Sequence, residues 1–292
     1  MTEIVPALVS LIVLGILAVQ VRGRLAFDYA DRLSAATAVS EGQKKRSGAA
    51  VRGGMLFRGG ESRAVALLIR NQFKYDQKFR LAVLSILPLT AIYFFMALRE
   101  GPLADPFVTA EGFNDSLLLY FSVLMFPVIM KNTLSNSDAY QASWIYYATP
   151  ADRGRLVLAS KNFVFAYFVI PYLILIGALF FYFFPIPWHG LVHLGILALL
   201  SHSFLQIAVF FSPVLPFSMP VRKAQRSGSF ILVLTLGPIA AILLLFVFAR
   251  WVYPNPALLL GVLAAFAAGT HQMERALKAR VQSRTVSLEY HE

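Results

Sequence analysis

Long apolar runs separated by shorter polar segments dominate this sequence. Seven of these runs reach or approach the roughly 17–25 residues that a helix needs to cross a bilayer. They cover residues 4–21, 81–98, 116–133, 163–184, 191–211, 229–249 and 256–271, and Pro127 interrupts the third. Because a helix satisfies its backbone groups within one such segment, the pattern predicts an all-α integral membrane protein with about seven transmembrane helices.

Lysine and arginine are concentrated in alternate connections between the apolar runs. The connections at 22–80, 131–161, 212–228 and 271–292 contain 24 of the 26 Lys and Arg residues. The positive-inside rule places such connections in the cytoplasm. We therefore expect the N-terminus outside and the C-terminus in the cytoplasm, in a multi-pass protein of the bacterial cytoplasmic (inner) membrane.

The composition changes this picture little. Hydrophobic residues make up 58% of the 292 residues and charged residues 14%, compared with about 45–50% and 25% in soluble domains. The net charge of +11 follows from the topological placement of Lys and Arg, so we expect no nucleic-acid partner. Because the chain has no cysteine, disulfides, thiolate metal sites and thiol catalysis are excluded.

The first cytoplasmic connection divides into two parts. It follows the first predicted transmembrane helix, residues 1–21. Its first part, residues 22–60, is rich in Gly and basic side chains, and we expect a flexible linker there. Residues 61–80 have helical periodicity, with cations on one side and apolar side chains on the other. We expect an amphipathic interfacial helix with its aromatic rings among the acyl chains; the alternative is a helix packed on the protein's own surface. The residues assigned to the interfacial helix are Arg63, Arg70, Phe73, Lys74, Lys78 and Phe79.

The second cytoplasmic connection, 131–161, is aromatic and basic. Polar residues at 135–137 are suitable N-caps for a short helix, which Thr149-Pro150 ends because the residue before proline resists the α region. A second helix should begin near Asp152 and lead toward the fourth run. The simpler interpretation is an aromatic belt with topogenic arginines, which accounts for the residue types but not for the length of about thirty residues.

Few polar side chains interrupt the apolar runs. The polar residues of the fifth run form a possible substrate path, which consists of Ser201, His202, Ser203 and Gln206. His189 and His193 have i,i+4 spacing, which we interpret as an interfacial pair in preference to a metal site. No carboxylate lies inside a predicted run, which argues against a proton-relay transporter. Prolines in 212–220 predict a broken or re-entrant cytoplasmic mouth.

The sequence contains no phosphate-binding Gly-x-x-x-x-Gly-Lys-Ser/Thr, no HExxH and no Gly-x-Ser-x-Gly motif. From about residue 61 onward, however, its layout resembles the permease subunits of type-two ABC exporters. ESRAVALLIRNQFKYDQKFR (61–80) resembles their connecting helix, residues 81–271 their six-span domain, and NSDAYQASWIYYATPADRGRLVLASK (136–161) their coupling loop, followed by a cytoplasmic tail, 272–292.

This resemblance implies a coupling loop that docks on a separate ATP-binding cassette subunit, which holds ATP and Mg. The chain itself is then not an enzyme and binds no cofactor or metal. Its other partners are membrane lipids and a second permease subunit, in a homo- or hetero-dimer, and the extra first span allows it to be one half of a split permease. The residues expected at the ATPase are Tyr140, Trp144, Tyr146, Tyr147, Pro150, Asp152, Arg153 and Arg155.

Two other classes of function remain open from the sequence. One is an intramembrane enzyme acting on lipid through His193 or His202. The other is a non-transporting membrane scaffold or regulatory subunit, which would fit if the 201–206 patch were sealed by packing.

Overall fold

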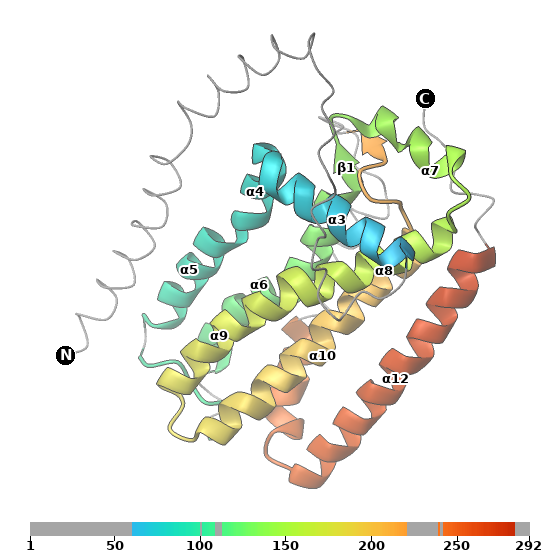
Figure 1. Ribbon diagram of the computed structural model, residues 1–292. Helices are drawn as coiled ribbons and strands as arrows, with labels where there is room; N and C mark the ends of the chain where they lie inside the picture. Colours follow the sequence, from blue (N-terminus) through green and yellow to red (C-terminus); the bar gives the residue numbers. More distant parts are fainter. Residues whose placement is uncertain (1–59, 100, 109–112, 221–238, 240–241, 284–292) are drawn as a thin grey trace, which may run out of the picture. The chain divides into compact units, whose positions relative to one another are not determined.

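The computed structural model describes residues 60–99, 101–108, 113–220, 239 and 242–283 (Figure 1). The chain divides into two units, Met1–Gly54 and Met55–Glu292, and every described residue belongs to the second. The predicted first span, the linker up to residue 59 and most of the 229–249 run lie outside the described residues.

The described residues are predominantly helical, which confirms the all-α class. Two two-residue strands, β1 (Asn136–Ser137) and β2 (Met219–Pro220), pair in parallel. The helices in chain order are α3 (Gly60–Tyr75), α4 (Gln77–Leu84), α5 (Ile86–Ala97), α6 (Phe113–Ser135), the 3-10 helix η1 (Tyr140–Trp144), α7 (Ile145–Ala148), α8 (Arg153–Val164), the π-helix η2 (Phe165–Val169), α9 (Ile170–Phe183), α10 (Pro187–Phe211), the π-helix η3 (Phe248–Val252) and α12 (Pro256–Ser283).

Five helical stretches in the described part of the chain are long and apolar enough to cross a membrane. They are Gln77–Ala97, Ser116–Ser135, Arg153–Phe183, Pro187–Phe211 and Pro256–Val281. Each overlaps one of the runs predicted from the sequence, so the membrane-protein class is supported, and the count of seven stays a prediction.

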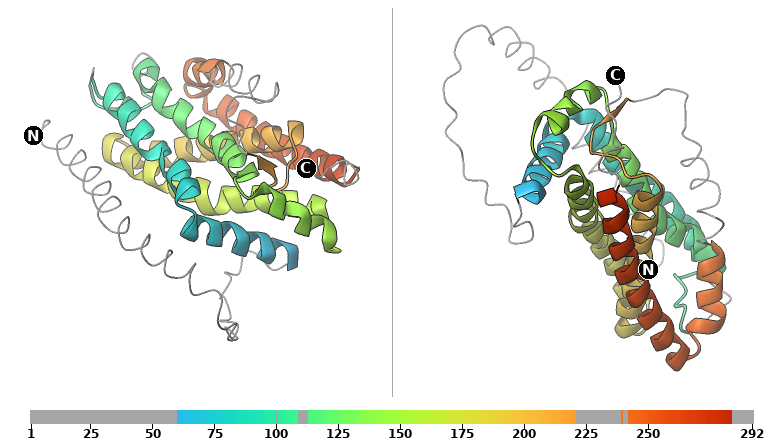
Figure 2. Two further views of the ribbon diagram at one scale, coloured as in Figure 1. Left: turned by 90° about the horizontal axis from the view of Figure 1, so that it is seen from above. Right: turned by 90° about the vertical axis from the view of Figure 1, so that its right-hand side faces the viewer.

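Helices α6 and α10 form the centre of the packing. Helix α6 packs against α5 and α10, and α10 also contacts α9 and α12 (Figures 1 and 2). Fully buried side chains on the two central helices include Leu119, Tyr120, Leu124, Leu197 and Leu200. Lipid is as apolar as these side chains, so close van der Waals packing, not exclusion from water, stabilises this centre.

Two prolines in the apolar helices have different effects. Pro127 lies inside the continuous helix α6, so the prediction that it interrupts this run is wrong; neighbouring helices can satisfy the freed backbone group. Pro171 follows the π-turn η2, where the N–H of Ile170 donates to the carbonyl oxygen of Phe165. A proline nearby removes a backbone donor from the helical ladder, which favours such a widened turn.

The predicted single helix over 61–80 is broken in the structure. Helix α3 ends at Tyr75, and Asp76 adopts an extended conformation (φ −92°, ψ 109°). Its Oδ1 accepts a hydrogen bond of 3.1 Å from the N–H of Phe79 and so caps α4. The second membrane-spanning stretch therefore begins at Gln77, four residues before the predicted start at 81.

The apolar side of this region faces protein. Helix α3 packs on α8, with Val65 and Ile69 buried. Phe79 is 5% exposed, and its ring meets the rings of Phe168 (6.5 Å) and Phe217 (5.4 Å) edge-on. The expectation that Phe79 lies among acyl chains is therefore wrong, and the alternative of a helix packed on the protein is correct for this side. Phe73 is half-buried, and the assigned cations are exposed: Arg63, Arg70, Lys74 and Lys78.

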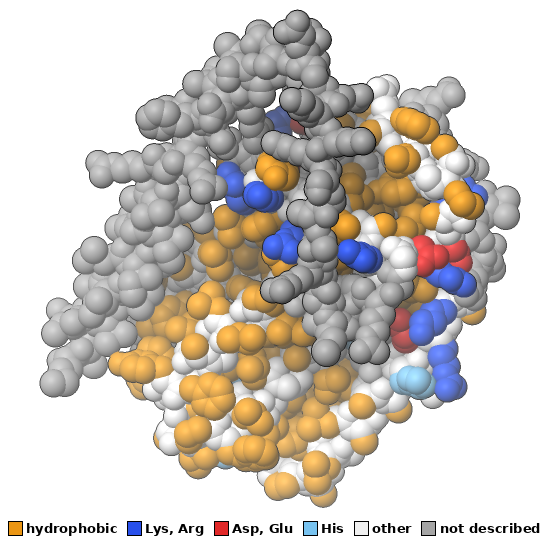
Figure 3. Space-filling view, in the orientation of Figure 1, with side chains coloured by type: hydrophobic (Ala, Val, Ile, Leu, Met, Phe, Trp, Pro, Cys, Tyr) orange, Lys and Arg blue, Asp and Glu red, His pale blue; other side chains and the backbone are white. Residues whose placement is uncertain are grey.

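The last helix is longer than predicted. Helix α12 is continuous from Pro256 to Ser283, so the first residues of the predicted tail, from 272 onward, are helical. On the face shown in Figure 3, the described Lys and Arg side chains lie across the upper and middle part and down the right-hand edge, while the lower left is hydrophobic. This separation is what a helix bundle with one basic membrane surface requires.

Candidate functional site

Residues 140–155, called here the coupling segment, carry the most exposed aromatic side chain of the predicted coupling loop. Helices η1 and α7 together present Trp144, 58% exposed, and Ile145, 50% exposed. Tyr146 and Tyr147 are half-buried and pack against the core. A large apolar pair held outward on a short, ordered turn is a surface suited to a partner protein.

The bend in this segment matches its prediction. Helix α7 ends at Ala148, and Thr149 is extended (φ −99°, ψ 150°), as expected before Pro150. The Oδ1 of Asp152 accepts hydrogen bonds from the N–H groups of Gly154 (2.9 Å) and Arg155 (3.3 Å), which caps α8.

The two flanking helices differ from their prediction. Residues 135–137 cap no new helix, because α6 itself runs to Ser135 and is followed by β1 and the 3-10 turn η1. Helix α8 is not a separate short helix either. It continues through η2 into α9, so that Arg153–Phe183 is one 31-residue stretch. The coupling segment therefore joins this long helix directly.

One hydrogen bond fastens the coupling segment to residues 212–220, and further backbone contacts tie those residues to the end of α6 and to β1. The hydroxyl of Tyr146 donates to the carbonyl oxygen of Pro216 at 3.1 Å, and burial raises the pKa of Tyr146, which keeps it a donor. The N–H of Phe217 donates to the carbonyl of Leu134 at 2.7 Å. Phe217 has a left-handed backbone (φ 56°), and the pairing of β1 with β2 lies beside it. The irregular 212–220 segment is thus tied to the end of α6.

The charged residues of the coupling segment have partners within the protein. The guanidinium of Arg153 stacks over the Tyr147 ring at 5.0 Å. Arg155 pairs with Asp152 (3.3 Å) and with Glu61 of α3 (3.6 Å), and all three side chains are partly exposed. Such exposed pairs contribute roughly 0–1 kcal/mol each, so the arginines can exchange these partners for others. Tyr140 is half-buried and Pro150 is exposed.

The predicted substrate path does not form one surface. Ser201 is buried and donates to the carbonyl of Val123 in α6 (3.4 Å), and His202 lies edge-on to Phe165 in η2 (4.6 Å). Ser203 and Gln206 instead line a groove of about 320 Å³ against α12, whose other lining includes Phe266, Gly269, Thr270 and Met273. The structure therefore brings together two of the four residues.

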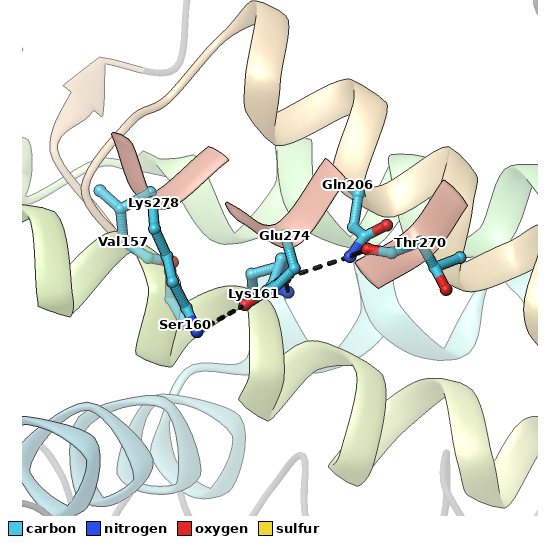
Figure 4. A network of polar contacts seen from close by, with 7 residues as sticks. All are labelled: Val157, Ser160, Lys161, Gln206, Thr270, Glu274 and Lys278. Atoms are coloured by element: carbon cyan, nitrogen blue, oxygen red, sulfur yellow. Dashed lines mark hydrogen bonds and ion pairs between the residues drawn. The ribbon is translucent and has the colours of Figure 1, made fainter. Parts of the chain in front are cut away.

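Gln206 belongs to a charged network that the sequence reasoning missed (Figure 4). Its amide nitrogen donates to the carbonyl of Thr270 and to Oε2 of Glu274, both at 3.1 Å. Glu274 also forms an ion pair with Lys161 of α8, whose side chain is 1% exposed, and lies 4.0 Å from Lys278. The i,i+4 spacing of Glu274 and Lys278 was a signal that the helix continues past 271.

At the opposite end of α10, the predicted histidine pair is divided between two partners. Nδ1 of His189 lies 2.7 Å from Asp105, and Nδ1 of His193 is hydrogen-bonded to the hydroxyl of Tyr253. His189 also stacks on Phe107, so this cluster anchors the 101–108 connection. No group of three or more potential metal ligands occurs among the described residues.

Comparison with known proteins adds no relative: no protein-family model, curated protein or solved structure matches this chain.

Proposed function

We propose that this chain is the membrane-spanning permease subunit of an ATP-driven exporter, coupled to a separate ATP-hydrolysing subunit through the coupling segment. The observation that carries the proposal is the ordered, outward presentation of Trp144 and Ile145 on a turn that residues 149–152 join to a membrane-length helix. In the proposed arrangement the chain has seven spans with its N-terminus outside, in the bacterial inner membrane.

The contacts of the coupling segment support a role in transmitting motion. Its end leads directly into α8, Tyr146 contacts the segment that follows α10, and Asp138, just before it, pairs with Lys78 of α4. A force applied at Trp144 would therefore reach three membrane-length helices through short paths. A loop that served only to return the chain has no need of these connections.

Trp144 should be the main anchor on the ATPase, because large aromatic side chains in closely packed pockets dominate binding energy. Arg153 and Arg155 should act nearer the rim and affect the rate of association more than residence time. The test is copurification of an ATPase subunit with the chain from native membrane. Trp144→Ala should weaken this association by about 2 kcal/mol or more, and Arg153→Ala by clearly less.

Tyr75→Ala is a matched control, because Tyr75 is 57% exposed on α3, outside the coupling segment. It should leave association unchanged. If Trp144→Ala inserts, folds and still binds and stimulates the ATPase as the parent does, the coupling role is wrong.

A non-transporting scaffold or regulatory subunit is the second candidate. It is favoured by the burial of Ser201 and Gln206, which seals much of the proposed substrate path. A scaffold would bind its partner through the same exposed Trp144 but would not stimulate ATP hydrolysis, so reconstituted ATPase activity separates the two functions.

A further inference from the structure

The groove between α10 and α12 has the size of a small ligand and opens to the surroundings of the helix bundle. Its volume is about 320 Å³, at the lower end of the roughly 300–1,000 Å³ that ligand pockets have. Three of its lining residues, Ile207, Ala265 and Gly269, are exposed. Because both helices are of membrane length, the groove opens toward the acyl chains of the bilayer.

The side-chain oxygens of this groove are hydrogen-bond acceptors with unused capacity. The hydroxyls of Ser203 and Thr270 donate to backbone carbonyls of their own helices (2.9 and 2.8 Å), so their protons are taken while their oxygens can still accept. Gln206, 1% exposed, uses its amide nitrogen for Thr270 and Glu274, which points its oxygen away from that carboxylate (Figure 4). This buried oxygen has no hydrogen-bond partner among the described residues, although buried polar atoms normally have one.

No charged side chain of the described part of the chain lines the groove, and most of its wall is apolar, including Phe266 and Met273. The neighbouring carboxylate of Glu274 is already paired with Lys161 and lies 4.0 Å from Lys278. An anionic ligand would therefore find no cationic donor in the lining, and a cationic ligand no uncompensated carboxylate. The lining favours an uncharged molecule that is mostly apolar and donates hydrogen bonds at one end.

The groove lies where α12 changes from apolar to charged. Residues 257–269 contain only apolar side chains and glycine, and Glu274, Arg275 and Lys278 follow soon after. In a bilayer this change corresponds to the boundary between the hydrocarbon core and the polar interfacial region. The glycerol group of a lipid occupies this boundary, with its acyl chains on the apolar side.

We infer that this groove binds one uncharged membrane lipid with a free glycerol hydroxyl, of the monoacylglycerol or diacylglycerol class. The hydroxyl donates to the acceptor oxygens that Gln206, Ser203 and Thr270 bring together, and an acyl chain lies along the apolar wall between α10 and α12. The inference is independent of the proposed function, because it concerns a lipid that stays with the protein and not the exported molecule.

The test is native mass spectrometry of the purified chain in an amine-oxide detergent, which has no hydroxyl group that could compete. Two probes with the same acyl chain are titrated: monoolein, which has free glycerol hydroxyls, and methyl oleate, which has none. Monoolein should give a single bound molecule per chain and should bind about three- to fivefold more tightly than methyl oleate, the factor expected for one hydrogen bond.

Three variants locate the binding. Gly269→Leu should abolish binding of both probes, because its side chain fills the groove, and a Cβ added at Gly269 meets no other atom within 4 Å, so the fold should be kept. Gly261→Leu is the matched control: its Cβ is equally free on the same helix, but it does not line the groove, and it should bind as the parent does. Gln206→Met keeps the length of the side chain, removes its oxygen, and should lower the affinity for monoolein to that for methyl oleate.

Equal affinities of the parent for the two probes would overturn the inference, since the groove would then accept any apolar chain. Undiminished binding of monoolein by Gly269→Leu would also overturn it, and this reading needs no Gln206 variant to fold. A parent that is a dimer, binds no monoolein and is separated into monomers by Gly269→Leu but not by Gly261→Leu would assign the groove to a second copy of this chain instead.

Discussion

If the proposed coupling role is correct, removing the hydroxyl of Tyr146 should lower stimulation of the partner ATPase without weakening its binding. Tyr146→Phe keeps the half-buried ring and deletes one donor. At 3.1 Å the bond to Pro216 is at the long end for an O–H···O contact, so its loss should cost about 1 kcal/mol, and about 3 kcal/mol at most if the carbonyl stays unsolvated.

The rest of the attachment should hold the coupling segment in place. The hydrogen bond from Phe217 to Leu134 and the β1–β2 pairing do not involve Tyr146. Trp144 stays exposed on the other side, so binding of the ATPase should change less than twofold. Because 1.4 kcal/mol corresponds to a factor of ten, losing about 1 kcal/mol of coupling should lower ATPase stimulation about fivefold.

The assay is ATP hydrolysis by the reconstituted complex, measured with a pull-down of the ATPase from the same preparation. Tyr182→Phe is the matched control, since Tyr182 is 66% exposed and lies outside the coupling segment, and it should behave as the parent does. Full stimulation by Tyr146→Phe would refute the idea that this bond transmits motion. Loss of binding in step with stimulation would instead place Tyr146 in the interface.

Three further substitutions test the packing. Glu274→Gln should destabilise the protein by about 3–5 kcal/mol, because it leaves the buried ammonium of Lys161 uncompensated. In thermal unfolding, the double variant Glu274→Gln/Lys161→Met should regain a large part of this stability. Phe79→Ala should lower the free energy of unfolding by about 3–5 kcal/mol. Little change in thermal unfolding would instead mean that the Phe79 ring contacts lipid and not the protein core. Asp152→Ala should cost about 0.5–2 kcal/mol through loss of the α8 cap, and Asp152→Asn, which can still accept both hydrogen bonds, should unfold close to the parent's temperature.

The features of the fold that depend on residues close together along the chain were predicted correctly. Thr149-Pro150 ends one helix and Asp152 begins the next because proline sterics and a carboxylate cap act within a few residues. The five confirmed membrane-length helices follow in the same way from the length of their apolar runs. The break at Asp76 was missed because the helical periodicity of 61–80 runs across this residue, whose carboxylate in fact caps α4.

The candidate site was less predictable because its contacts join distant segments. Nothing in the periodicity of 61–80 distinguishes lipid from the rings of Phe168 and Phe217 as the surroundings of Phe79, since both are apolar. Lys161 and Glu274 are 113 positions apart, and the sequence analysis placed them in two different segments, the connection 131–161 and the tail 272–292. The tie between Tyr146 and Pro216 likewise depends on where the 212–220 segment returns, which no local pattern specifies.

In the proposed coupling, the π-turn η2 would serve as the pivot of the continuous Arg153–Phe183 stretch. The twelve residues of α8 and the fourteen of α9 correspond to arms of about 18 Å and 21 Å at 1.5 Å per residue. With a pivot between arms of nearly equal length, a tilt of about 10° would move both ends by about 3–4 Å in opposite directions. A pull on the coupling segment would then reach the far end of the helix undiminished and with its direction reversed.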